Sequence, residues 1–211
     1  MCFSPRASMI AFMAGIIGSI LCILLGTITD QIVGYFFAFL SLIQGIEYLL
    51  WTHQICDDYN KRLSILAIIF NHLQPVVLGI LILTINTGIR YPYYILSVLF
   101  VYLCIIIPYS LQFTSNHQCT VKNAKQHLQW NWNLMDYSIP VYFSFFVSIV
   151  LLCLLGFPKL KHGIMFSITG FIIYATSLII YNRDAGSLWC YYSVFIPIVY
   201  YLLRVTKKII T

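Results

Sequence analysis

The sequence is poor in charged side chains. Asp, Glu, Lys and Arg make up 9% of its 211 residues, with six acidic and twelve basic side chains, whereas soluble domains carry roughly 25%. Apolar residues make up 61% of the chain, above the roughly 45–50% of soluble domains. Because so few ionic groups cannot cover a water-exposed surface, the composition excludes an ordinary soluble domain and predicts that lipid is the main solvent.

The common catalytic and cofactor motifs are also missing. The chain has no Cys-x-x-Cys or His-Glu-x-x-His pattern for zinc, no Gly-x-Ser-x-Gly and no glycine-rich phosphate loop. The sequence therefore assigns no catalytic residue, cofactor or metal site. Its net charge of +6 lacks the basic stripe of a nucleic-acid surface and is interpreted as anchoring beside the membrane.

Long apolar runs dominate the rest of the chain, and each is long enough, or nearly so, to cross a bilayer as a helix. The seven runs are residues 8–27, 31–51, 63–86, 91–111, 137–157, 163–181 and 187–203. The polar breaks between them are short, which is typical of antiparallel helix neighbours. Only the connection 112–136 is long, and its residues 126–133 are expected to lie at the membrane interface as an amphipathic turn or helix. The pattern predicts one all-α domain over 1–211, an integral membrane bundle of seven transmembrane helices with one longer loop between the fourth and fifth.

Seven spans place the two termini on opposite sides of the membrane. We call the face with the N-terminus and residues 52–62, 112–136 and 182–186 the N-side, and the other face the C-side. Lys and Arg divide six to six between the faces, and four to six when Lys122 and Lys125 of the long loop are left out. Positive residues favour the cytoplasm, so the count predicts an extracytoplasmic N-terminus and a cytoplasmic C-terminus.

The rarer side chains gather on the N-side. This face holds all four tryptophans and four of the seven cysteines, namely Trp51, Trp130, Trp132, Trp189, Cys2, Cys56, Cys119 and Cys190. An aromatic belt is the simple explanation, but belts form at both interfaces. The asymmetry favours a functional surface or cavity mouth.

Two neighbouring runs carry polar residues at depths where polar groups are costly. Gln44, Glu47 and Trp51 have i, i+3, i+7 spacing and share one helical face. Glu47 is the only acidic residue well inside a run, so it is expected to face the bundle interior, either at a functional site or as a hydrogen-bonding contact between helices.

The third run adds Asn71, His72 and Gln74, and Pro75 predicts a kink beside them. Two residues of the long connection are expected to complete the site. The predicted polar pocket consists of Gln44, Glu47, Trp51, Asn71, His72, Gln74, His127 and Trp130.

The N-side cysteines have two interpretations. A disulfide between Cys2 and Cys190 would join the first and last helices if this face meets an oxidising compartment. In a reducing compartment they would stay thiols, and Arg6 near Cys2 partly suits a reactive thiolate. Buried, inert thiols are the alternative.

Several short motifs occur together in this chain. They are Met1-Cys-Phe-Ser4 with Ser8, Gln44-Gly-Ile-Glu-Tyr-Leu-Leu-Trp51 and Ser187-Leu-Trp-Cys190. In this respect the chain resembles an uncharacterised family of small multi-span membrane proteins found in bacteria and giant DNA viruses, and Asn71-His-Leu-Gln-Pro75 with His127-Leu-Gln-Trp130 is most similar to the viral branch. The resemblance implies no activity. It implies that one arrangement contains Cys2, Gln44, Glu47, Trp51, Pro75, His127, Trp189 and Cys190.

Three functions fit these observations. The first is binding or translocation of a small solute or proton, with Glu47 as the protonatable group and His72 or His127 as its partner, which predicts a water-filled cleft. The second is a membrane-embedded thiol-redox or metal-dependent enzyme with Cys2 as nucleophile or ligand, which places the Cys2 sulfur near Cys190, or near Glu47 and a histidine. The third is a structural component of a viral or host membrane, which predicts a closed, dry bundle.

Overall fold

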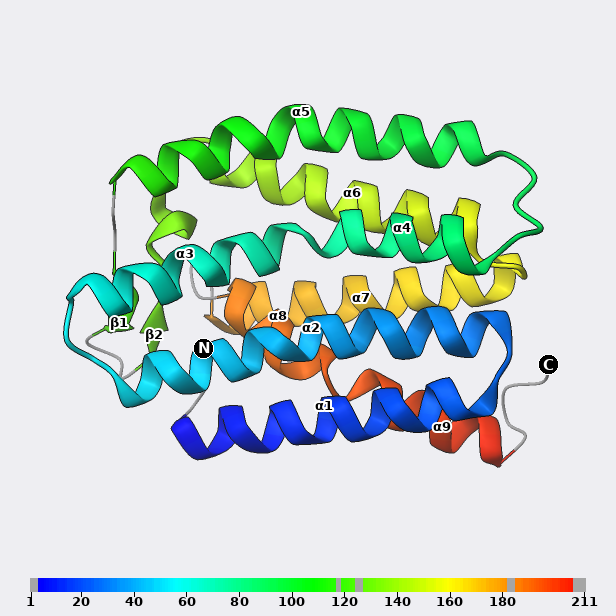
Figure 1. Ribbon diagram of the computed structural model, residues 1–211, viewed down its shortest axis with the longest axis horizontal. Coiled ribbons are helices and arrows are strands. Elements are labelled where there is room, and N and C mark those ends of the chain that lie inside the picture. The colour runs from blue at the N-terminus through cyan, green and yellow to red at the C-terminus, as the bar shows by residue number, and fades with distance from the viewer. Residues whose placement is uncertain (1–3, 117–118, 124–126, 182–184, 207–211) are drawn as a thin grey trace.

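The fold is essentially all-α, as the sequence predicts. A computed structural model describes residues 4–116, 119–123, 127–181 and 185–206, and most of its helices run side by side along one long axis (Figure 1). The helices are α1 (Pro5–Leu25), α2 (Ile28–Thr52), α3 (Asp58–His72), α4 (Gln74–Ile85), α5 (Pro92–Asn116), α6 (Ser138–Gly156), α7 (Leu160–Tyr181), α8 (Ala185–Ser193) and α9 (Ile196–Val205).

Six helical segments of the described chain are long and apolar enough to cross a membrane. The pair α3 and α4 makes a seventh if it is counted as one bent span, since its two helices meet at 46°. The break falls at Leu73, and α4 starts at Gln74 with Pro75 in its first turn. Pro75 has no N–H to donate to the preceding turn, so the helix cannot continue through it unbroken. The predicted kink is therefore present.

The last predicted run, 187–203, is also interrupted. The span Leu188–Val205 covers most of α8 and all of α9, and a turn at Val194 and Phe195 separates these two helices. Pro197 lies in the first turn of α9, where a proline is tolerated because that N–H needs no partner within the helix. The bundle thus contains two discontinuous spans.

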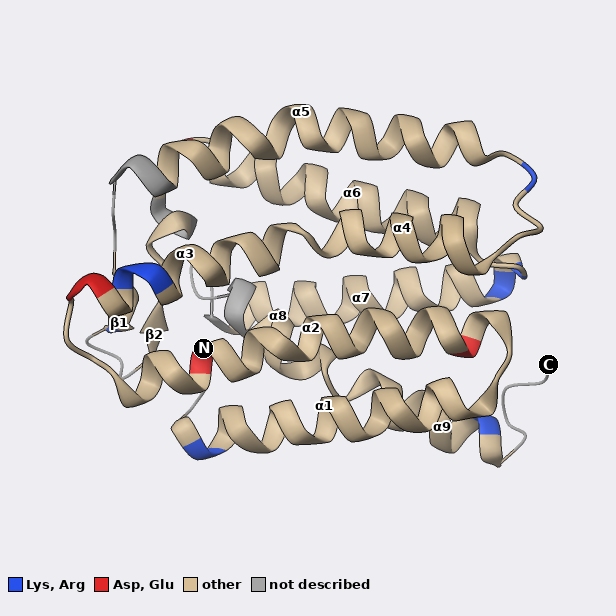
Figure 2. Ribbon diagram, in the orientation of Figure 1, with Lys and Arg blue, Asp and Glu red and all other residues tan. Residues whose placement is uncertain are grey.

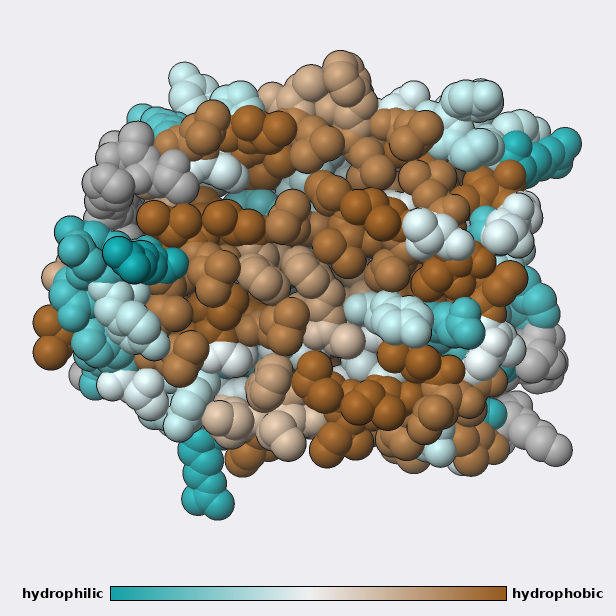
Figure 3. Space-filling model, in the orientation of Figure 1, coloured by the Kyte–Doolittle hydropathy of each residue, from teal (hydrophilic) through white to brown (hydrophobic). Residues whose placement is uncertain are grey.

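Charge and hydropathy divide the surface into two polar ends and an apolar middle. Lys and Arg gather toward the two ends (Figure 2), and a broad apolar zone separates the more hydrophilic ends (Figure 3). Large apolar side chains are exposed on the helices, for example Phe100 (69%), Phe171 (65%) and Ile179 (84%). The start of α1 and the end of α9 lie toward opposite ends of the bundle (Figure 1). This pattern fits an integral, multi-pass membrane protein.

The long connection differs from its prediction. It forms a small antiparallel hairpin, in which β1 (Val121–Lys122) pairs with β2 (Leu128–Gln129), followed by the 3₁₀ helix η1 (Asn131–Leu134). Trp130 and Trp132 are 1% and 0% exposed, and their ring centroids lie 4.5 Å apart. These two indoles therefore pack inside the protein and do not form an apolar face toward lipid.

Helices α1 and α2 pack closely at Gly34. A Cβ atom added there would lie 2.7 Å from the backbone oxygen of Ser19 and 3.0 Å from the backbone nitrogen of Ile23. Backbone atoms cannot rotate away as a side chain can. The absence of a side chain at Gly34 is therefore a condition for this helix pair.

We expect Gly34→Ala to lower the free energy of unfolding by about 1–3 kcal/mol, the usual cost of overpacking a tight contact. The matched control is Gly45→Ala in the same helix, where the added Cβ would meet only the Phe12 ring at 3.6 Å. Thermal unfolding in detergent measures both. Equal melting temperatures for the two variants would contradict the close approach.

Candidate functional site

A cluster of polar side chains is buried where the α3–α4 break meets α2 and α8. Gln44, Glu47 and Gln74 are 0% exposed, Asn71 is 1% and His72 is 2% exposed. Five of the predicted pocket residues therefore lie inside the bundle. None of them faces the lipid zone.

Direct contacts tie α3, α4 and α8 together at this point. The Gln74 side-chain nitrogen donates to Asn71 Oδ1 at 3.5 Å and lies 3.8 Å from Cys190 Sγ. Cys190 Sγ donates to Asn71 Oδ1 at 3.6 Å. Cys190 lies one helical turn before the α8–α9 break. Asn71 lies two residues before the α3–α4 break at Leu73. The two discontinuous spans therefore meet at the polar cluster.

His72 occupies an aromatic cage beside the break. Its ring centroid lies 5.8 Å from that of Tyr109, 5.7 Å from that of Tyr142 and 6.3 Å from that of Phe145. The Tyr102 hydroxyl donates to the backbone oxygen of His72 at 2.9 Å, so this carbonyl at the break has a partner. Neither ring nitrogen of His72 has a hydrogen-bond partner among the described residues.

Other buried polar atoms of the cluster also lack a hydrogen-bond partner among the described residues. Within the described ranges, Asn71 Nδ2 and Gln74 Oε1 are buried and have no hydrogen-bond partner. Buried polar groups in native proteins are almost always paired with protein or water. The cluster therefore retains donors and acceptors that a small polar guest can use.

The long connection covers the cluster on the N-side. Trp132 Nε1 donates to the Tyr142 hydroxyl at 3.2 Å, and the Tyr109 hydroxyl donates to the backbone oxygen of Trp132. Tyr109 and Tyr142 are two walls of the His72 cage, so Trp130 and Trp132 reach the cluster through them. Sequence reasoning missed both tyrosines and left Trp132 out of the site. Tyrosine is common in membrane helices, and only the rotation of α5 and α6 places these two inside.

Two other predicted site residues are His127, beside β2, and Trp51, in α2. His127 closes the hairpin, where its backbone oxygen accepts from Asn123 N at 2.7 Å and its backbone nitrogen donates to Asn123 Oδ1 at 3.1 Å. Trp51 is 9% exposed in the apolar core near the end of α2. Cys2 lies outside the described residues.

The disulfide of the structure joins Cys56 and Cys119, with a Cα–Cα distance of 5.6 Å. Cys190 is a buried thiol outside this disulfide, and because Cys2 is not among the described residues, its pairing with Cys190 stays a prediction. The long connection folds back against the α2–α3 turn and brings Cys119 to Cys56, while Cys190 contacts the polar cluster.

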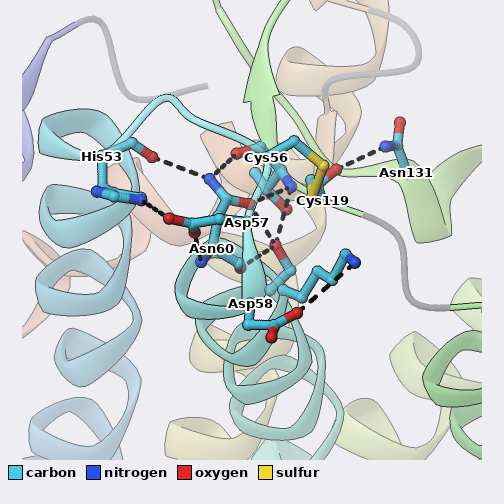
Figure 4. The surroundings of a disulfide bond; sticks show 10 residues. His53, Cys56, Asp57, Asp58, Asn60, Cys119 and Asn131 are labelled. Atoms are coloured by element: carbon cyan, nitrogen blue, oxygen red, sulfur yellow. Dashed lines mark hydrogen bonds and ion pairs between the residues drawn. A yellow bond between two sulfur atoms is a disulfide. The ribbon is translucent and has the colours of Figure 1, made fainter.

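Polar contacts reinforce this disulfide (Figure 4). Asn60 is 0% exposed, and its Nδ2 donates to the backbone oxygens of His53 at 2.9 Å and Thr120 at 3.0 Å. Thr120 N donates back to Asn60 Oδ1 at 3.0 Å. These bonds fasten the long connection over the N-side end of α3.

Asp57 begins α3 in the same region. Its Oδ1 accepts from the backbone nitrogen of Asn60 at 3.0 Å, and its Oδ2 lies 2.9 Å from His53 Nε2. The Asn60 hydrogen bond, followed by that of His53, lowers the pKa of the Asp57 carboxyl below its usual value. Both contacts favour the ionised carboxylate, which also suits a helix N-terminus.

Metal coordination was tested on the same geometry. Among the residues that the structure describes, no three His, Cys, Asp or Glu side chains lie together as a metal site.

No protein-family model, curated protein or solved structure was found to match the chain.

Proposed function

We propose that this multi-pass membrane protein binds and translocates a small solute or proton through the buried polar cluster, with His72 taking up the proton and Glu47 as the nearby acid. The observation that carries the proposal is the buried imidazole between two helix breaks, with neither ring nitrogen hydrogen-bonded among the described residues.

The incomplete pairing distinguishes the cluster from an ordinary contact between helices. A contact that only holds helices together gains from pairing its donors and acceptors, and each buried group left unpaired costs about 1–3 kcal/mol. A bound solute, a water chain or a proton supplies the missing partners. Ionisable residues inside membrane spans commonly mark such pathways.

The two discontinuous spans provide the means of movement. Transporters build midplane sites from broken helices, whose loose ends can shift while the rest of the bundle stays rigid. Here the breaks at Leu73 and at Val194–Phe195 adjoin the cluster. With its residues at most 2% exposed, the cluster does not form the open, water-filled cleft that translocation predicts, and the proposal takes this conformation as an occluded one.

The enzyme alternative gains less support from the same residues. Its nucleophile or ligand, Cys2, is not among the described residues. The proposed partner Cys190 is hydrogen-bonded to the uncharged side chains of Asn71 and Gln74, whereas a reactive thiolate needs nearby cations or a helix N-terminus. The structural-component alternative requires only a closed bundle. The flux experiment below distinguishes it from translocation.

We also propose that the N-side is extracytoplasmic. Disulfides persist mainly in oxidising compartments, and the Cys56–Cys119 disulfide lies on the N-side. The Lys and Arg count favours the same orientation. The C-terminus would then be cytoplasmic.

The test is proton flux in proteoliposomes that contain an internal pH dye and are given a pH difference with potassium and valinomycin. We expect the wild-type protein to collapse the difference faster than empty vesicles, and His72→Phe to reduce the rate to that of empty vesicles. Phenylalanine fits the aromatic cage, so the variant should fold, and its melting temperature checks this.

The matched control is His53→Gln, because His53 is a half-buried N-side histidine away from the cluster. Its flux should equal that of the wild type. Wild-type flux no greater than that of empty vesicles, or equal flux from His72→Phe, would contradict proton translocation and favour a purely structural cluster.

A further inference from the structure

A pocket with basic side chains among its lining residues opens at the C-side end of the bundle, away from the polar cluster. Three segments that are distant in sequence form it: the start of α2 with Thr27 and Thr29, the α6–α7 turn with Lys159 and His162, and the end of α9 with Arg204. It has a volume of about 520 Å³, including its open mouth. The arrangement does not depend on the proposed translocation.

The basic groups of this pocket outnumber its acidic ones. Lys159 is exposed at the rim, and Arg204 lies deeper with a side chain 10% exposed. The nearest carboxylate is Asp30, which is 0% exposed and accepts hydrogen bonds from Thr27, Tyr200 and Arg204. The buried Asp30 carboxylate therefore neutralises the charge of Arg204. Lys159 leaves the mouth of the pocket positively charged.

Arg204 has N–H groups that do not donate to Asp30. Its Nε and Nη2 each donate to Asp30 at 3.0 Å, while a guanidinium has five N–H groups in all. The ion pair with Asp30 fixes the plane of the guanidinium. A second anion would thus meet a positioned donor and not a mobile side chain.

His162 lines the pocket with one ring nitrogen near a partner and the other without one. It is 5% exposed and lines the pocket, and its Nδ1 lies 3.3 Å from Thr29 Oγ1. Its Nε2 has no hydrogen-bond partner in the described part of the chain. When Nδ1 accepts from the Thr29 hydroxyl, Nε2 carries the hydrogen of the neutral ring. An unused donor then faces a cationic pocket.

We infer that this C-side pocket binds a phosphate group, held by Lys159, His162 Nε2 and the free edge of Arg204. Phosphate oxygens suit this donor set, because Arg binds them through its planar fork and Lys as a point charge. The pocket lies where apolar helices end, and basic groups at the ends of membrane spans suit lipid phosphates. The phosphate is that of an anionic lipid headgroup or of a free phosphate, and the experiment separates these sources.

The experiment titrates the purified full-length protein in uncharged detergent and measures its melting temperature. One arm uses inorganic phosphate, a second uses dihexanoyl phosphatidic acid, and a third uses dihexanoylglycerol, which has the same chains without the phosphate. We expect a saturable rise in melting temperature with at least one of the two phosphate compounds. A rise with phosphatidic acid alone identifies a lipid headgroup, and a rise with both identifies a general phosphate site.

Variants test the residues. Lys159→Gln and His162→Phe should each weaken binding by about tenfold, the loss expected for one charge-assisted hydrogen bond. Arg204 is left intact because its removal would unpair Asp30. The matched control is Arg90→Gln, which removes one positive charge from a residue outside the pocket that stacks over Tyr91.

Three results would overturn the inference. The first is that neither phosphate compound gives a saturable rise in melting temperature, and the second is that dihexanoylglycerol raises it as much as dihexanoyl phosphatidic acid does. The third is that Lys159→Gln and Arg90→Gln lose affinity equally. The last would mean that the anion responds to general surface charge and not to this pocket. Since Lys159 is exposed, its variant should fold even if His162→Phe does not.

Discussion

Replacing Cys56 with Ser is expected to lower the free energy of unfolding by up to about 4 kcal/mol, the chain-entropy value for a closed loop of this length. The cysteines are separated by 63 residues, and the segment between them includes α3, α4 and α5. Without the disulfide, the long connection is held to the α2–α3 turn mainly by the Asn60 and Thr120 hydrogen bonds. The cover over the His72 cage should therefore open more readily.

Thermal unfolding in detergent, with and without a reducing agent, measures this effect. The wild-type protein should lose stability on reduction, and Cys56→Ser should be insensitive to the reductant. Cys104→Ser is the matched control, because Cys104 is an exposed free cysteine of α5. If Cys56→Ser and Cys104→Ser melt at the same temperature, the disulfide does not stabilise the N-side end.

The sequence predicted those features that depend on local composition. The apolar runs indicate the spans because an unpaired backbone cannot cross lipid except as a helix or closed barrel. Pro75 indicates the break because proline removes a helix hydrogen bond wherever it occurs. Glu47 was expected to face inward because a carboxyl is costly in lipid, and it is 0% exposed.

The features that the sequence did not predict depend on helix rotation and on distant partners. Tyr109 and Tyr142 resemble any other tyrosine of the spans until the rotation of α5 and α6 is known. Cys56 has several possible partners, and only the folding of the long connection selects Cys119. The C-side pocket unites residues separated by more than a hundred positions, such as Thr29 and His162, which no local pattern links.

Asp30→Asn is expected to cost about 3–5 kcal/mol, the usual result of removing one partner from a buried ion pair. Sequence analysis placed Asp30 in a short polar break, yet it is 0% exposed in the first turn of α2. Its Oδ1 accepts from the Tyr200 hydroxyl at 2.6 Å and from Arg204 Nε at 3.0 Å, and its Oδ2 accepts from Arg204 Nη2 at 3.0 Å. Asparagine keeps the size but leaves the guanidinium without its counter-ion.

Thermal unfolding of Asp30→Asn beside Asp58→Asn separates a buried ion pair from an exposed one. Asp58 lies 3.8 Å from Lys61 and is 90% exposed, and exposed pairs contribute only about 0–1 kcal/mol. The first variant should melt well below the wild type and the second close to it. Because the Asp30 contacts join the start of α2 to α9, their loss should also loosen the C-side pocket and weaken phosphate binding. Unchanged stability of Asp30→Asn would mean that Arg204 finds another counter-ion, and the proposed fixing of its guanidinium by Asp30 would then be wrong.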